Sequence, residues 1–349
     1  MRKQRFAAFQ VACTYVGTVV GAGFASGQEI YHFFGRFGAW GYLGIALALF
    51  LFSYLGYQMM LLGHRVKARS FREVSNFLFG PWIGGFINAV LLLMLFGVTV
   101  AMLAGSGELF RERMNLPFDV GVSITIAVTF LTLFRGIDGI LKANSVIVPI
   151  MVSFVLFAAV RAFMTPHSLY HAYHISLYLA GKPLLAGISA VVYGSFNVGL
   201  AAGVLIPVGA DIGDKTVLQM GSRWGASALA FMLMAVTFTL FIHYPQATAY
   251  AVPMGYVATT LGRFLQWMFV LVLWGEIYST LVGNVYAMVA QIPMSSRMLQ
   301  ALVALILLGI AFLFSQIGFA AIVAYGYTVF GYVSLLLLLT ILWPRSKQA

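Results

Sequence analysis

The glycine-rich run GTVVGAGFASG, residues 17–27, lies inside the first apolar segment of the chain. A second run, GSFNVGLAAG at 194–203, echoes it in the other half of the 349 residues. Within these runs, GFASG (23–27) and GLAAG (199–203) share one pattern at an offset of 176 residues: glycine, a large apolar residue, alanine, a small residue, glycine. Glycine lacks a β-carbon and interrupts a helix at little cost. The pair therefore predicts two interrupted helices at corresponding points of two half-chains.

The composition places these runs in a membrane. Hydrophobic residues make up 62% of the chain and charged residues only 8%, which is typical of an integral membrane protein. Apolar stretches near 20 residues, the length that crosses a bilayer as a helix, recur along the chain. The sequence therefore predicts an all-α fold with ten transmembrane helices in a single domain, 1–349. The ten predicted spans are 6–35, 38–62, 81–110, 118–134, 143–163, 183–209, 223–244, 257–290, 298–315 and 318–343.

The basic residues indicate how the spans are oriented. A net charge of +11 would suit a nucleic-acid partner, but the basic residues lie in short loops between spans, so no nucleic-acid partner is expected. With the N-terminus inside, 14 of the 20 Lys and Arg residues fall on the inner side and six on the outer side. Cytoplasmic loops carry the excess of basic residues in membrane proteins. Both termini are therefore predicted to be cytoplasmic.

Ten spans divide the chain into two five-helix halves, 6–163 and 183–343. Because five is odd, the second half starts on the opposite side of the membrane, and the halves form an inverted repeat. GELF (107–110) and GEIY (275–278), in the third and eighth spans, give a weaker echo. Interrupted helices at corresponding points of such repeats indicate the binding site of a secondary transporter.

An interruption frees backbone groups that lipid cannot satisfy, so it is tolerated only inside the protein or along a cavity. The freed carbonyls can coordinate a cation, and the amides of the resumed helix can bind a carboxylate. The alternative is close helix packing, because glycines four residues apart, such as Gly17 and Gly21, form a small-residue face. Either run alone favours packing, whereas the correspondence of the two favours interruption.

On these motifs the chain resembles LeuT-fold secondary transporters of the amino acid–polyamine–organocation superfamily, most of all the bacterial ten-span amino-acid permeases. The resemblance covers the whole chain in topology and spans 1, 6 and 8 in motifs. It implies a 5+5 inverted repeat with helices 1 and 6 broken, in the cytoplasmic membrane of a bacterium. It also implies sodium as the coupling ion, with no other cofactor. Hard oxygen ligands for the ion would be the carbonyls of Gly17, Val20 and Glu276 and the hydroxyls of Ser279 and Thr280.

The resemblance also implies where a solute would bind. The substrate-binding residues on the other side of the interruption and along the sixth span are expected to be Thr18, Val19, Ala22, Gly23, Ser195, Phe196 and Asn197. Two positions depart from the family pattern. Thr18 stands where sodium-dependent members often carry asparagine, which argues against a second sodium ion. Lys142 lies at the cytoplasmic edge of the fifth span, whereas some proton-coupled relatives place a lysine deeper in it.

Three acidic residues, Glu29, Glu108 and Glu276, fall within predicted spans. A membrane-embedded charge costs at least about 2.5 kcal/mol on insertion scales, so each is a candidate proton or gating carboxylate. Glu276 is the deepest and lies one turn before Thr280 on the same helical face. It is an ion ligand, a proton carrier or a structural acceptor. Glu29 and Glu108 lie near the outer ends of their spans, where water lowers the cost.

The predicted function is secondary active transport of a small amino acid or related zwitterion, coupled to sodium. Access would alternate around a midplane site between helices 1 and 6. Two alternatives stay open, namely proton coupling through Glu276 and an amino-acid-sensing membrane receptor that does not transport. The expected partners are the small-molecule substrate and the lipid bilayer. No Ser-His-Asp, HExxH or phosphate-loop pattern stands out in the sequence, so an enzyme is not predicted.

Overall fold

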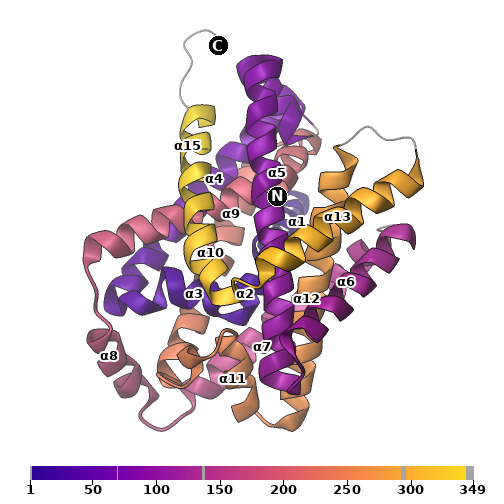
Figure 1. Cartoon of the computed structure of the whole chain (residues 1–349). Helices are drawn as coiled ribbons and strands as arrows, with labels where there is room; N and C mark the ends of the chain where they lie inside the picture. Colours follow the sequence, from indigo (N-terminus) through magenta and orange to yellow (C-terminus); the bar gives the residue numbers. More distant parts are fainter. Residues whose placement is uncertain (1, 69, 136–137, 292–295, 343–349) are drawn as a thin grey trace.

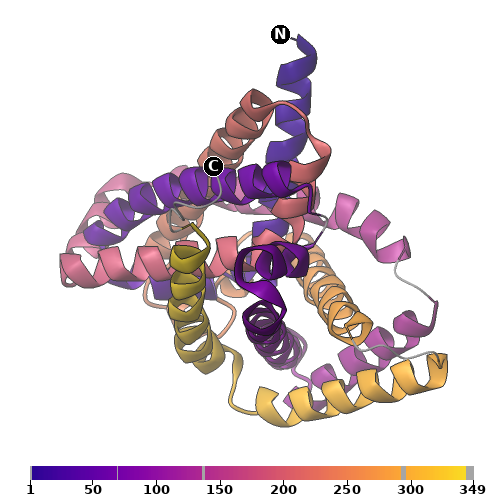
Figure 2. The same cartoon turned by 90° about the horizontal axis from the view of Figure 1, so that it is seen from above.

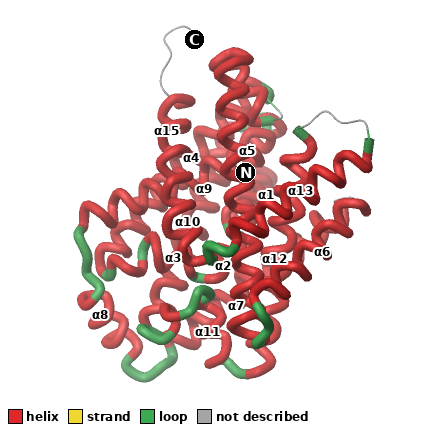
Figure 3. Tube along the Cα trace, viewed as in Figure 1, coloured by secondary structure: helices red, strands yellow, loops and turns green. Residues whose placement is uncertain are grey.

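The structure is a computed structural model that describes residues 2–68, 70–135, 138–291 and 296–342. Helices joined by short turns make up these segments, and no strand occurs in them (Figures 1 and 3). The predicted all-α class is confirmed for this part of the chain. The α-helices are α1 (Arg2–Val19), α2 (Ala22–Ser26), α3 (Gln28–Phe33), α4 (Ala39–Val66), α5 (Phe71–Met114), α6 (Phe118–Arg135), α7 (Asp138–Phe163), α8 (Ser168–Tyr178), α9 (Pro183–Asp211), α10 (Lys215–Ile242), α11 (Pro253–Thr260), α12 (Arg263–Ala290), α13 (Arg297–Ser315), α14 (Phe319–Ala321) and α15 (Thr328–Leu342). Short 3₁₀ turns η1 (Gly35–Phe37) and η2 (Ala247–Ala249) and the π-helix η3 (Ile322–Tyr327) complete the set.

Seven of the described helices are long and apolar enough to cross a membrane, and the bent pair formed by α7 and α8 raises this count to eight. The other predicted spans correspond to α1 with α2 and α3, and to α6. The first of these begins with three basic residues and is interrupted, and the apolar part of α6 is only Phe118–Leu133. The protein is therefore a multi-pass helical membrane protein, while ten spans in an inverted repeat stay a prediction.

Several helix boundaries differ from the predicted ones. The third span was expected from residue 81, but α5 begins ten residues earlier, where Ser70 caps it by accepting a hydrogen bond from the Glu73 N–H at 3.2 Å. Gly80 interrupts its helical conformation at φ 78° and ψ 171°, immediately before Pro81. Proline has no N–H and disfavours a helical residue before it. The predicted start is thus the kink of a longer helix.

The eighth predicted span, 257–290, is also wrong in its bounds. It comprises the second half of α11 and all of α12, which Gly262 separates at φ +105°. The long connection at 164–182 contains a helix of its own, α8, and the tenth predicted span includes the π-helix η3. The break at Gly262, helix α8 and the π-helix η3 are not accompanied by a change in hydropathy. A hydropathy pattern therefore does not locate them.

The sixth span is unbroken, contrary to the prediction. α9 runs as one helix from Pro183 to Asp211 and includes the whole second glycine run. The reason is close packing against α15: a β-carbon on Gly199 would lie 2.6 Å from the Ser334 hydroxyl oxygen. The glycines there serve helix–helix contact, which is the alternative that either run alone favours.

Helices α1, α4, α9 and α10 pack together as a group, and α12 packs with α5, α6 and α7 beside it (Figures 1 and 2). The closest contact in the first group is reciprocal. A β-carbon on Gly63 of α4 would collide with the Ile206 carbonyl of α9, and one on Gly209 of α9 would collide with the Met60 carbonyl of α4. Small residues let two helix backbones approach in this way.

Candidate functional site

The first helix is interrupted where the sequence predicts it. The Val20 N–H closes the last turn of α1 on the Val16 carbonyl at 2.8 Å, and Gly21 is then extended, at φ −124° and ψ −172°. The next helix, α2, starts at Ala22. A helix leaves the carbonyls of its last turn and the amides of the following first turn without intrahelical partners. The carbonyls of Gly17 and Val20 lie in that interval.

A second interruption follows at Gly27, five residues after the start of α2. Gly27 is in the left-handed region at φ +80° and ends α2, and its missing side chain makes room for Met254 of α11. Ser26 stabilises the turn because its hydroxyl donates to the Gly23 carbonyl at 2.7 Å and accepts from the Gln28 N–H at 3.2 Å. The glycine run in the sequence thus encodes two bends rather than one.

The first interruption opens onto an internal cavity of about 420 Å³ between α1 and α2, α5, α9 and α12. Most of the predicted site residues line it. Those expected to bind substrate are Thr18, Val19, Ala22, Gly23, Phe196 and Asn197. Those expected to bind sodium are Gly17, Val20, Glu276, Ser279 and Thr280. The structure therefore brings the two predicted sets together around one space, and their roles stay predictions.

Two predicted residues lie elsewhere. Ser195 is fully buried but does not line the cavity, because α9 is a continuous helix whose cavity face is Phe196, Asn197 and Leu200, with Gly203 and Val204 two turns on. In a helix of 3.6 residues per turn, position 195 falls beside that face. Glu108 also lies outside the cavity lining and forms an ion pair with Arg111 one turn further along α5. The side chain of Lys142 lies outside the described residues.

α12 presents one polar face to the cavity. Glu276, Ser279, Thr280 and Asn284 follow helical spacing along it. The Ser279 hydroxyl donates to the Glu276 carbonyl at 3.0 Å, so these two predicted ion ligands are already adjacent. Oε1 of Glu276 and Nδ2 of Asn284 are buried with no hydrogen-bond partner among the described residues. Asn284 was not predicted, although its position four residues after Thr280 places it on the same face.

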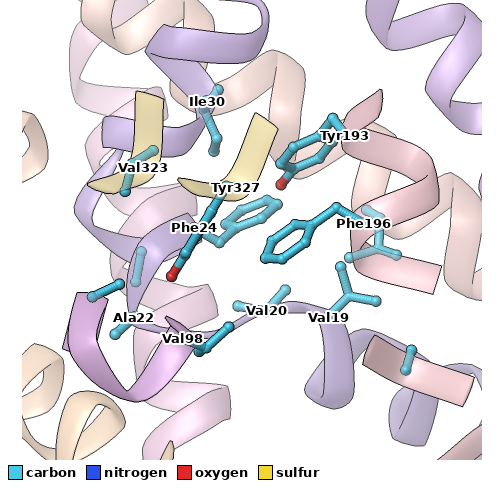
Figure 4. Close-up of a cluster of buried hydrophobic side chains, with 14 of the residues drawn as sticks. Val19, Val20, Ala22, Phe24, Ile30, Val98, Tyr193, Phe196, Val323 and Tyr327 are labelled. Carbon is cyan, nitrogen blue, oxygen red and sulfur yellow. The ribbon is translucent and has the colours of Figure 1, made fainter. Parts of the chain in front are cut away.

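Aromatic side chains that were not predicted lie beside the predicted residue Phe196. Tyr327 lines the cavity from the end of η3, and its ring packs on Phe196 with centroids 4.5 Å apart and an interplanar angle of 32°. Tyr193, one turn before Asn197, is fully buried, and its hydroxyl points towards the rings of Phe24 and Phe196 (Figure 4). A π-turn shifts the facing of the residues after it and often marks a functional site.

Glu29 reaches the same cavity from the first turn of α3 and is only 6% exposed. Its carboxylate fills the space where a side chain on residue 23 would lie, so Gly23 is the residue that leaves room for it. Tyr327 and Phe196 line the same cavity as this carboxylate. The cavity thus has two acidic residues, Glu29 and Glu276, and no Lys, Arg or His among its described lining residues.

Two solved structures of secondary transporters share this all-helical architecture. The Na+-coupled sialic acid symporter in its substrate-bound outward-open state matches with a TM-score of 0.63 and 12% identity, over 95% of this chain and 76% of that one. A mutant form of the Eremococcus coleocola manganese transporter matches with a TM-score of 0.56 and 14% identity, over 96% of this chain and 77% of that one. At these identities the likeness shows the fold.

Sequence comparison identifies the family. The chain is 33% identical to the uncharacterized membrane protein YkvI of Bacillus subtilis (strain 168), over 100% of this chain and 99% of the relative. The chain belongs to the family of that membrane protein. It is also 28% identical to the uncharacterized protein YyaD of the same organism, over 94% of both chains. No family model matches the chain.

Proposed function

We propose that the protein is a sodium-coupled secondary transporter of a small amine-bearing solute, an amino acid or related zwitterion. One observation carries the proposal: the free carbonyls at the end of α1 and the Glu276–Thr280 face of α12 line a single cavity. Carbonyl and hydroxyl oxygens suit a hard cation. The fold that the chain shares with an Na+-coupled symporter supports the same conclusion.

The proposed topology is ten spans in a 5+5 inverted repeat, with both termini in the cytoplasm of a bacterium. α1, α4, α9 and α10 would rock as a group against the helices around α12 and expose the cavity to each side in turn. The contacts support such a group, since these four helices pack mainly on one another. Ion binding between α1 and α12 would favour one state through its higher affinity for that state.

Proton coupling is the second candidate, and the buried Glu276 carboxylate favours it. Glu276 is 3% exposed, and its Oε1 has no hydrogen-bond partner among the described residues. A carboxylate that exchanges a proton with each side of the membrane would supply the same coupling without sodium.

Uptake into proteoliposomes distinguishes these candidates. Radiolabelled amino acids are offered under an inward sodium gradient without a pH gradient, and then under a pH gradient with sodium replaced by choline. The proposal expects sodium-driven accumulation that collapses with a sodium ionophore. Accumulation driven only by the pH gradient would shift the coupling to Glu276. Ligand-dependent thermal stabilisation without flux under either gradient would identify a receptor and refute transport.

A further inference from the structure

We propose that the cavity recognises its solute by a positively charged amine held at the Glu29 carboxylate, and that a carboxylate on the solute is not required. The inference rests on the proposed function, because it assumes that the cavity at the interruption is the solute site. The solute then needs a charged amine, and it does not also need the carboxylate that a zwitterion carries. The substrate class is then primary amines with an apolar body.

The first argument is that Glu29 is a buried acid without a basic partner. The acids at the end of α5 are paired, Glu108 with Arg111 and Glu112 with Arg113. Among the described residues, no ion pair or hydrogen bond to the Glu29 carboxylate occurs. A buried carboxylate is strongly disfavoured unless a positive group or hydrogen bonds compensate for its lost hydration. The side facing the cavity is open, so a cationic group of the solute supplies the missing partner.

The cavity that contains the Glu29 carboxylate also has an aromatic lining. Tyr327 and Phe196 line the cavity together with Glu29 and their rings pack on each other, and Tyr193 lies one turn before Phe196 on α9. Tyr193 is fully buried, and its hydroxyl has no hydrogen-bond partner among the described residues. Aromatic faces attract ammonium groups, and phenolic oxygens accept their hydrogen bonds. A carboxylate that shares its cavity with aromatic rings is therefore suited to an ammonium ion.

The third argument is the charge balance of the cavity. The described lining residues include two acids and no base. A solute carboxylate near the interruption would face Glu29, which already lies against Gly23. A bound cation at Glu276, Ser279 and Thr280, or the free amides at the start of α2, would then have to compensate for it. An amine without a carboxylate needs no such compensation, and the remaining walls, formed by residues such as Leu91, Val98 and Met102, suit an apolar body.

Three matched probes test the inference on the purified full chain. Leucine carries both charged groups, 3-methylbutylamine lacks its carboxylate, and 4-methylpentanoate lacks its amine. Binding is measured by thermal stabilisation and by titration calorimetry in one detergent with sodium present. We expect leucine and 3-methylbutylamine to bind with dissociation constants within about tenfold of each other, and 4-methylpentanoate to give no shift.

Glu29→Gln keeps the shape of the side chain and removes its charge, so amine affinity should fall by about tenfold or more, as for the loss of one charge-assisted hydrogen bond. The matched control is Glu108→Gln, which removes an equally buried acid outside the cavity and should leave amine affinity unchanged. Binding of 4-methylpentanoate, no binding of 3-methylbutylamine to the parent chain, or full amine affinity in Glu29→Gln overturns the inference.

The same probes separate this inference from the proposed function. If leucine binds and is accumulated under a sodium gradient while 3-methylbutylamine does not bind, the amine inference fails and the transporter proposal stands. If 3-methylbutylamine binds through Glu29 but no probe accumulates above its level in protein-free liposomes under either gradient, the transporter proposal fails and the amine site stands.

Discussion

Replacing Gly23 with alanine places a methyl group in space that the Glu29 carboxylate occupies. The added β-carbon would overlap Oε1 and the carboxyl carbon of Glu29, and it would lie 3.2 Å from Cγ of the same residue. No other residue is among the three nearest atoms, so the predicted conflict is between two side chains only. Both positions lie on the cavity, and Glu29 is 6% exposed.

The cost follows from how the conflict is relieved. Overfilling a packed interior costs typically about 1–3 kcal/mol. Because the colliding atoms are the free end of a flexible side chain, rotation of Glu29 relieves part of the overlap. We therefore expect Gly23→Ala to lower the free energy of unfolding by about 1–2 kcal/mol. The carboxylate is displaced by the same rotation, so amine binding should weaken as well.

A double-mutant cycle measures the conflict directly. Guanidinium unfolding, followed by tryptophan fluorescence in one detergent, compares the parent, Gly23→Ala, Glu29→Ala and the double variant. Removing the Glu29 side chain makes room for the methyl group, so the coupling energy should be about 1–2 kcal/mol. The control cycle uses Glu29→Gln, which has the same size and should not relieve the overlap. Additive effects in the alanine cycle, within about 0.5 kcal/mol, would refute the packing of Glu29 on Gly23.

Three further outcomes are expected. Thr280→Ala removes a proposed sodium ligand, so sodium should raise the unfolding temperature of the parent more than that of the variant; equal shifts would exclude this ion site. Tyr15→Phe removes the buried hydrogen bond to the Phe52 carbonyl, 2.9 Å long, and should lower the free energy of unfolding by about 1 kcal/mol in the same denaturant titration; an unchanged value contradicts this. Asp214→Ala removes the cap of α10 and should speed hydrogen exchange at the Thr216 amide. That N–H bond lowers the pKa of Asp214 below its ordinary 3.8, so the cap stabilises α10 above this pH and is lost as the pH falls through the lowered value. Parent and variant should therefore converge in acid, and a difference that persists there contradicts the cap.

The interruption of the first helix was predictable because glycine interrupts a helix at little cost and four glycines fall within residues 17–27. The polar face of α12 was also predictable, since Glu276, Ser279 and Thr280 have helical spacing. Extending that spacing by one turn gives Asn284, which was not among the predicted site residues. In both cases the information is local, within one helix.

The remaining parts depend on partners far away in the sequence. The pattern GLAAG is compatible with an interrupted helix or with close helix–helix packing. Gly199 packs against Ser334 of α15, so here the glycines serve helix–helix packing. Tyr327 reaches the cavity through a π-turn that has no sequence signature of its own. The position of the Glu29 carboxylate against Gly23 depends on the left-handed turn at Gly27, which separates α2 from α3.

The two bends of the first span place a conformationally free glycine at each end of α2. This helix is five residues long and lies between Gly21, whose α-carbon faces open space, and Gly27 in the left-handed region. Rotations at a few such residues absorb large changes in direction. Rotation of α2 about Gly21 and Gly27 would therefore move the side of the cavity formed by Gly23 and Glu29. The internal hydrogen bonds of α1 and α3 would be kept. Such a movement would change the shape of the cavity wall without unfolding a helix, and it would add to the rocking proposed for α1, α4, α9 and α10.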